Sequence, residues 1–167
     1  MITIVESGVH FGPFNPSQIY QVEKSATIQG ISGIKACEFI WWTNEQKLIL
    51  VEAKASVPSS TKNIDRFNEY FHEIFEKFDN SLQALLTGST GHSVHVRDEL
   101  SADIRAMNWR TSKITFYLVI PEAPKAYLPD LTDKLKQVLY RQCKLWRANA
   151  MVINKEMAQQ IGLIQHD

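Results

Sequence analysis

The sequence lacks an excess of charge of either sign. Its 167 residues include 18 basic and 18 acidic side chains, so the formal net charge at pH 7 is zero. A neutral chain offers nucleic acid no global electrostatic attraction, so any such binding has to come from local groups of basic residues. Hydrophobic residues make up 44% of the chain and charged residues 22%, which is typical of a packed domain and excludes a largely disordered chain.

Cysteines are few and long hydrophobic runs are absent. Cys37 and Cys143 lie far apart and match no metal-binding spacing, so we interpret both as reduced core residues, with a disulfide as the alternative. No apolar stretch approaches the roughly 20 residues of a membrane-spanning helix, and the N-terminus lacks the pattern of a secretory signal. We therefore expect a cytoplasmic protein that forms a single domain over residues 1–167.

The first third of the chain predicts a strand, a loop and a helix. Residues 1–5 form a short apolar run, and a loop with glycine and proline follows. Asn15 and Pro16 are a typical cap and first-turn residue, so we expect a helix from there to the residue before Gly30.

A β-hairpin is predicted next. Residues 36–42 and 47–54 are both rich in residues that favour strands, and residues 43–46 have turn chemistry. Two strands joined by so short a polar loop should pair with each other. Both are apolar at nearly every position, which places the hairpin inside a sheet that is covered on both faces.

Apolar residues at helical spacing predict one long helix after the hairpin and another later in the chain. The expected order is a helix from about Pro58 to Gly88, a polar loop over 89–110, a strand over 114–120, a helix from Pro129 to Trp146 and a last strand over 151–153. Alternation of this kind indicates an α/β fold, which we expect to be a three-layer sandwich with a mixed β-sheet flanked by helices.

Glu38, Glu52 and Lys54 are the candidate functional residues among the charged residues of the predicted hairpin. Glu38 and Glu52 each lie between two apolar neighbours, and carboxylates are seldom buried unless they are paired or bind a metal. Glu52 and Lys54 are two residues apart on one strand, so they project from the same face. The side on which Glu38 lies depends on the hairpin register, which the sequence leaves open. If that side is the same, two carboxylates and an ammonium converge.

This set of groups suits metal-assisted phosphoryl transfer. Two carboxylates can hold Mg²⁺ while leaving positions open for water and a phosphate, and the backbone carbonyl of Ala53 is a plausible extra ligand. Lys54 can position the attacking water and stabilise the negative transition state. The simpler interpretation is an exposed edge hairpin on which Glu52 and Lys54 form a solvated ion pair without function.

The element order and the Glu-Ala-Lys at residues 52–54 resemble the PD-(D/E)xK nuclease superfamily, also called the restriction-endonuclease-like fold. The resemblance covers residues 16–120 and rests on Glu38 and on residues 48–54. It implies that Glu38 and Glu52 are metal ligands and that Lys54 is catalytic. The implied protein is a nuclease dependent on Mg²⁺ or Mn²⁺ that hydrolyses phosphodiester bonds of nucleic acid, with DNA as the first expectation.

The resemblance also suggests further residues and one alternative. Many members add a glutamate from the preceding helix, for which Glu23 is the candidate, and Lys62 and Arg66 are candidates for phosphate contacts. Glu38 stands where aspartate is usual, and its extra methylene shifts the carboxylate. The alternative is therefore a catalytically silent member of the same fold that serves as a binding or assembly subunit.

Local basic charge is concentrated near the C-terminus. Residues 125–147 include six basic residues and two acids. A basic outer helix face could contact phosphates, but a solvated face is the interpretation we favour. Because no separate DNA-reading module is recognisable, we expect specificity to come from a second copy of the chain or from a partner protein.

Overall fold

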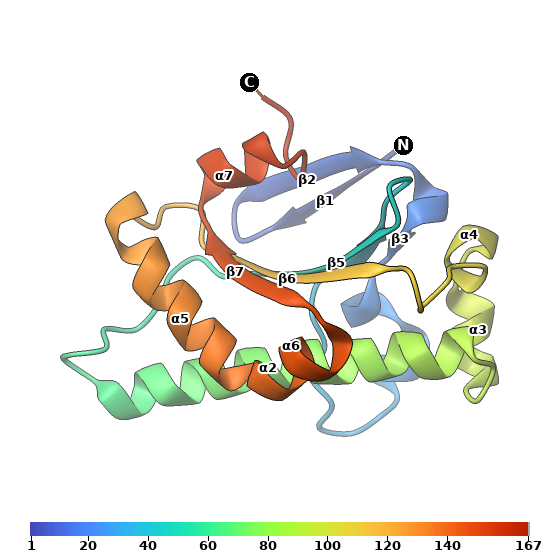
Figure 1. Ribbon diagram of the computed structural model, residues 1–167, viewed down its shortest axis with the longest axis horizontal. Helices are drawn as coiled ribbons and strands as arrows, with labels where there is room; N and C mark the ends of the chain where they lie inside the picture. The colour runs from blue at the N-terminus through green and yellow to red at the C-terminus, as the bar shows by residue number, and fades with distance from the viewer. Residues whose placement is uncertain (167) are drawn as a thin grey trace.

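The computed structural model describes residues 1–166 and has an α/β architecture built on two sheets (Figure 1). The larger sheet has five strands in the order β3-β4-β5-β6-β7, and the smaller is a two-stranded hairpin of β1 and β2. The first three strands of the larger sheet pair antiparallel and the last three parallel, so the sheet is mixed as expected. The strands are β1 (Ile2–Glu6), β2 (Val9–Phe14), β3 (Ile19–Tyr20), β4 (Phe39–Trp42), β5 (Lys47–Ala53), β6 (Lys113–Val119) and β7 (Asn149–Ile153).

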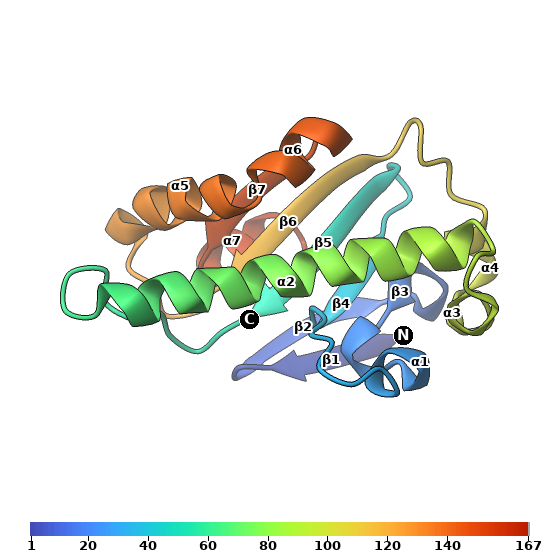
Figure 2. The ribbon, with the colours of Figure 1, turned by 90° about the horizontal axis from the view of Figure 1, so that it is seen from below.

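The five-stranded sheet lies between two layers of different kind. Helix α2 (Ile64–Ser89) runs across one face, beside α5 (Leu128–Val138) and α6 (Tyr140–Trp146), as Figures 1 and 2 show. The β1–β2 hairpin and α7 (Lys155–Gln160) cover the other face. Each face has its own apolar core. Leu48 and Leu50 belong to the core under α2, whereas Ile49 and Val51 belong to the core under the hairpin, as strand alternation requires.

The predicted hairpin is present and lies inside the sheet. Phe39 is paired with Val51 and Trp42 with Leu48, and β5 has β6 as its other neighbour. Every residue of β5 after Lys47 is buried. The prediction of a hairpin covered on both faces is therefore confirmed.

The helix predicted from Asn15 to Gly30 is wrong. The Asn15 side chain caps only a 3₁₀ turn, η1 (Pro16–Gln18), by accepting a hydrogen bond from the Ser17 N–H. The chain then extends as β3, because pairing with β4 satisfies its backbone, and continues through the 3₁₀ turn η2 (Val22–Lys24) into the one-turn helix α1 (Ala26–Gln29). Glu23 therefore lies on a turn at the sheet edge and not on a helix.

Other predicted boundaries differ for local reasons. The expected loop before Pro13 contains β2, because Ser7 and Gly8 both adopt positive φ and close a tight hairpin. The expected loop over 89–110 contains α3 (Val94–Glu99) and α4 (Ala102–Arg105), each capped by a serine side chain.

The second long helix is interrupted. It divides into α5 and α6 at Leu139, and Leu145 on α6 is 82% exposed. Both cysteines are free, and Cys37 is buried as predicted, while Cys143 is only half-buried. Among residues 1–166, no helix combines the length and the apolar character that crossing a membrane requires.

Candidate functional site

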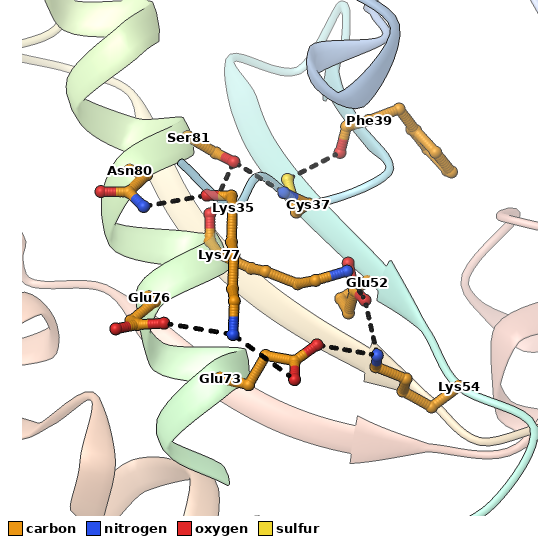
Figure 3. Close-up of polar contacts among 10 residues, drawn as sticks. All are labelled: Lys35, Cys37, Phe39, Glu52, Lys54, Glu73, Glu76, Lys77, Asn80 and Ser81. Atoms are coloured by element: carbon orange, nitrogen blue, oxygen red, sulfur yellow. Dashed lines mark hydrogen bonds and ion pairs between the residues drawn. The ribbon is translucent and has the colours of Figure 1, made fainter. Parts of the chain in front are cut away.

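Glu52 is the centre of the polar site. It is the second-last residue of β5 and points at α2, so its carboxylate lies between the sheet and the helix with no solvent exposure. The Lys77 ammonium, from the middle of α2, donates a hydrogen bond of 2.7 Å to Glu52 Oε1 (Figure 3). Glu52 Oε2 is also buried and has no hydrogen-bond partner. This burial excludes the interpretation of Glu52 and Lys54 as a solvated surface pair.

Burial and the two lysines act on the Glu52 carboxyl in opposite directions. Burial raises its pKa above the ordinary value, while the charges of Lys77 and Lys54 lower it, and burial dominates. Burial also lowers the pKa of Lys77, but the charge and hydrogen bond of Glu52, together with the charges of Glu38 and Glu23, outweigh it and the net shift is upward. Protonation of this site is therefore sensitive to any change in its counter-ions.

Lys54 lies at the open side of the site. Its ammonium is 3.7 Å from Glu52 Oε1 and 3.4 Å from Glu73 Oε1, and its side chain keeps 27% of its exposure. It also lines a cavity of about 620 Å³ together with Arg66 and Tyr70. The Tyr70 hydroxyl is buried without a hydrogen-bond partner, and burial followed by the charge of Glu52 raises its pKa. Lys54 thus lies between the buried carboxylate and this cavity.

Glu38 precedes β4 at a point where the pairing is irregular. Regular continuation of the register would place it opposite Glu52, but its backbone N–H donates to the Val51 carbonyl at 3.0 Å. The side chain is 8% exposed, and its Oε2 atom is buried without a hydrogen-bond partner. Burial, hydrogen bonding with Glu23 and the negative charge of Glu52 raise the pKa of Glu38 to about 9.

Two further acids surround Glu38. One carboxylate oxygen from each of Glu6, Glu23 and Glu38 lies within 4.8 Å of the other two. Glu6 is half-buried, Glu23 is exposed and Glu38 is buried. Three carboxylates at this separation repel one another unless protons or a cation neutralise them. The predicted acid Glu23 is therefore beside Glu38, although it reaches that position from a 3₁₀ turn.

Helix α2 is tied to the strand segment before Glu38. The Ser81 hydroxyl accepts a hydrogen bond of 2.8 Å from the Cys37 N–H and donates one of 2.6 Å to the Lys77 carbonyl (Figure 3). Ser81 is fully buried. The lysine that faces Glu52 and the residue next to Glu38 are thus held in one frame.

The structure brings most of the predicted site residues to one end of β4 and β5. Glu52 and Lys54 share a face, and Glu38 is near enough for the Glu52 charge to raise its pKa. Ala53 lies between Glu52 and Lys54, and its side chain belongs to the core on the opposite face. Arg66 lines the Lys54 cavity, whereas Lys62 is an exposed residue before α2 and is not among the residues that line it.

Sequence reasoning missed Lys77, Glu73, Tyr70 and Glu6. The first three lie on α2, where Tyr70, Ile74, Lys77 and Ser81 follow a spacing of four, three and four residues. That spacing marks one helix face, so a lysine and a serine in line with buried Ile74 were the available signal. Nothing in the sequence linked Glu6 to residues more than ten positions away.

The arrangement fits a hard divalent cation. Glu38 and Glu52 each keep a buried carboxylate oxygen without a partner, which costs free energy in a protein interior unless something coordinates it. Carboxylate oxygens are the ligands that Mg²⁺ and Mn²⁺ prefer. Glu6 and Glu23 add two more such ligands beside Glu38. The donor set is all oxygen, and no cysteine or histidine belongs to it.

Comparisons of the chain with protein-family models, with curated protein sequences and with solved structures give no match.

Proposed function

We propose that this protein is a nuclease that depends on Mg²⁺ or Mn²⁺ and hydrolyses phosphodiester bonds of nucleic acid, with DNA as the expected substrate. One observation carries the proposal. Two buried glutamates on adjacent chain segments, Glu38 just before β4 and Glu52 near the end of β5, each keep an unpartnered carboxylate oxygen, and Lys54 lies beside Glu52 at the mouth of a cavity. This is the combination of cation ligands and a positive group that phosphoryl transfer uses.

Glu38 and Glu52 would hold the cation, and the Ala53 carbonyl is the candidate for a further ligand. When bound, the cation would lower the pKa of a coordinated water and neutralise charge on the phosphate. Lys54 is placed to orient that water, because its ammonium lies 3.7 Å from Glu52 and also borders the cavity. Its fixed positive charge would then stabilise the additional negative charge of the transition state.

The cavity beside Lys54 is the proposed entry for the substrate backbone. Arg66 and Asn63 line it near the start of α2, and a guanidinium is well suited to grip a phosphate. Lys62 lies one residue before Asn63 and would extend the contact along the backbone. With zero net charge, the chain would obtain sequence or structure preference from a second copy or a partner protein.

A catalytically silent subunit is the second candidate, and Lys77 favours it. Its ammonium already occupies one side of Glu52 at 2.7 Å, so the carboxylate has a counter-ion without any metal. A protein that had lost catalysis would keep such a pair for stability. In that case the cation site would have no role, and the fold would serve binding or assembly alone.

A cleavage assay separates the two candidates. Purified protein is incubated with end-labelled single-stranded and double-stranded DNA in Mg²⁺ or Mn²⁺ at about 5 mM, a concentration high enough for weak oxygen-ligand sites. An excess of chelator provides the metal-free control. The nuclease proposal expects products with the wild-type protein in the presence of metal and none with the chelator. It also expects none with Glu52→Gln. Intact DNA under every condition, with RNA tested in parallel, would favour the silent subunit.

A further inference from the structure

We propose that Glu6, at the end of the first strand, is a ligand of a divalent cation that it shares with Glu23 and Glu38. The inference deepens the proposed nuclease site, because Glu38 belongs to both. It assigns a metal-binding role to the β1–β2 hairpin, which carries Glu6. The cation would connect three segments: the hairpin, the 3₁₀ turn η2 and the start of β4.

The geometry of the three carboxylates is the first support. Their nearest oxygens lie within 4.8 Å of one another, which is the separation expected for oxygens that surround one ion at 2.0–2.6 Å each. The three residues come from separate elements, so the grouping does not follow from proximity in sequence. An oxygen-only donor set with three carboxylates suits Mn²⁺, Mg²⁺ or Ca²⁺.

The buried oxygen of Glu38 is the second, independent support. Glu38 is 8% exposed, and its Oε2 atom has no hydrogen-bond partner among residues 1–166. Surface acids can gather without consequence because water solvates them. A buried carboxylate with a free oxygen lacks that solvation, so it points to a ligand.

The fold explains how the site stays open to an ion. Strand β3 pairs with β4 only at Ile40 and Trp41, so it ends before it can cover Glu38. The chain then turns away through η2, which carries Glu23 past this gap. The tight turn at Ser7 and Gly8 fixes the end of β1, where Glu6 pairs with Val9. The three acids thus meet at the point where β3 stops pairing with β4.

Charge balance distinguishes this cluster from the neighbouring Glu52. Lys77 and Lys54 both lie within 4.0 Å of Glu52. Lys35, Lys54 and Lys77 form their described ion pairs with Glu52, Glu73 and Glu76 and not with the three acids of the cluster. The cluster therefore has no close cationic side chain like those beside Glu52, and a divalent cation is a counter-ion that its geometry accommodates.

The test is a titration of the full chain with Mn²⁺ alone. Binding is measured by calorimetry and by the electron paramagnetic resonance signal of the Mn²⁺ that stays free. We expect Glu6→Gln to weaken binding at least tenfold and Glu23→Gln to do the same. Asp98→Asn, which removes an exposed carboxylate on α3, is the matched control and should bind as wild type does. Circular dichroism without metal checks that each variant is folded.

Two outcomes would overturn the inference: absence of Mn²⁺ binding by the wild-type protein, or Glu6→Gln binding Mn²⁺ as tightly as wild type. DNA cleavage is measured in a separate assay and tests the nuclease proposal. If the Glu6→Gln variant cleaves DNA and binds Mn²⁺ with unchanged affinity, Glu6 is not a ligand, and the nuclease proposal is still supported. If Mn²⁺ binding depends on Glu6 but the wild-type protein does not cleave DNA, the cation site is supported and the nuclease proposal is wrong.

Discussion

Lys77 and Glu52 form a buried ion pair of 2.7 Å between the middle of α2 and the end of β5. The Glu52 side chain has no solvent exposure and that of Lys77 has 13%. A pair in this position satisfies a carboxylate that the sheet would otherwise bury alone. The ammonium is bound to Oε1, so Oε2 is the Glu52 oxygen that the proposed cation would use.

Replacing Lys77 should therefore destabilise the metal-free protein. Lys77→Met leaves Glu52 buried with Lys54 as its remaining positive neighbour at 3.7 Å, and breaking a buried pair from one side costs about 3 kcal/mol. Urea unfolding measures the loss. The double variant Lys77→Met with Glu52→Gln should recover most of it, because no buried charge remains. A single variant as stable as wild type would contradict the structural importance of the pair.

Lys54→Ala should abolish cleavage and leave folding intact. Its side chain is partly exposed and its ion pairs are long, so the melting curve should change by less than about 1 kcal/mol of unfolding free energy. The loss of rate follows from its proposed contact with the attacking water. Lys113→Ala, at the opposite end of the parallel strands, is the matched control and should cleave normally. Parallel loss of activity and folding would instead make Lys54 a structural partner of Glu52.

Divalent cations should raise the melting temperature. An ion that binds only the folded protein stabilises it by mass action, by about 2.7 kcal/mol at a concentration one hundredfold above the dissociation constant. Thermal melts with and without millimolar Mn²⁺ measure the shift, and Glu52→Gln should lose most of it. A wild-type melting temperature that stays constant as Mn²⁺ or Mg²⁺ is added would rule out the proposed metal site.

Stability should fall as pH rises from about 5 to about 9 in the absence of metal. The pKa of Glu38 is raised from 4.5 to about 9, so the folded protein keeps a proton there that the unfolded chain releases. Between these values the folded state binds more protons, and stability decreases with pH by up to about 1.4 kcal/mol per unit for one proton. The stability that the Glu38 proton contributes is fully present below the unfolded-state pKa of 4.5. It is lost as the pH approaches the folded-state pKa of about 9.

Glu38→Gln tests this pH dependence, because the amide cannot titrate. Unfolding free energies from urea titrations at pH 5 to 8 should show a shallower slope for the variant than for wild type. Binding of Mn²⁺ should also release a proton from Glu38, which calorimetry in buffers of different ionisation enthalpy detects. Equal slopes for the two proteins would place the excess proton on another group.

The sequence was sufficient for the hairpin and for α2 because each has a strong periodic pattern. Residues 47–53 are apolar almost throughout, and the apolar residues of α2 repeat at helical spacing over 26 residues. The region around Asn15 misled the prediction, since a cap and a proline fit both a helix and a single 3₁₀ turn. The choice between them depends on pairing of Ile19 and Tyr20 with β4, which is a contact between distant residues.

The site residues also divide into those that a local sequence pattern predicts and those that depend on contacts between distant residues. Glu52 and Lys54 were identifiable because they are two residues apart at the end of the predicted strand, and strand alternation predicts a common face for them. Lys77 was not, since the rotation of α2 against the sheet depends on core packing at Phe71, Ile74 and Phe78. The role of Glu6 was the hardest to predict from the sequence, because its approach to Glu38 depends on how the β1–β2 hairpin packs on the sheet.

The Ser81 link between α2 and Cys37 restricts how the proposed site would adjust to a bound cation. Ser81 holds the backbone at Lys77 and beside Glu38 through two hydrogen bonds, so the adjustment of Lys77 would be confined to its four-carbon side chain. Side-chain rotations are much faster than the microseconds to milliseconds of backbone rearrangements. The slow step of loading then lies in the ion's own water shell. Mg²⁺, which dehydrates reluctantly, should load more slowly than Ca²⁺.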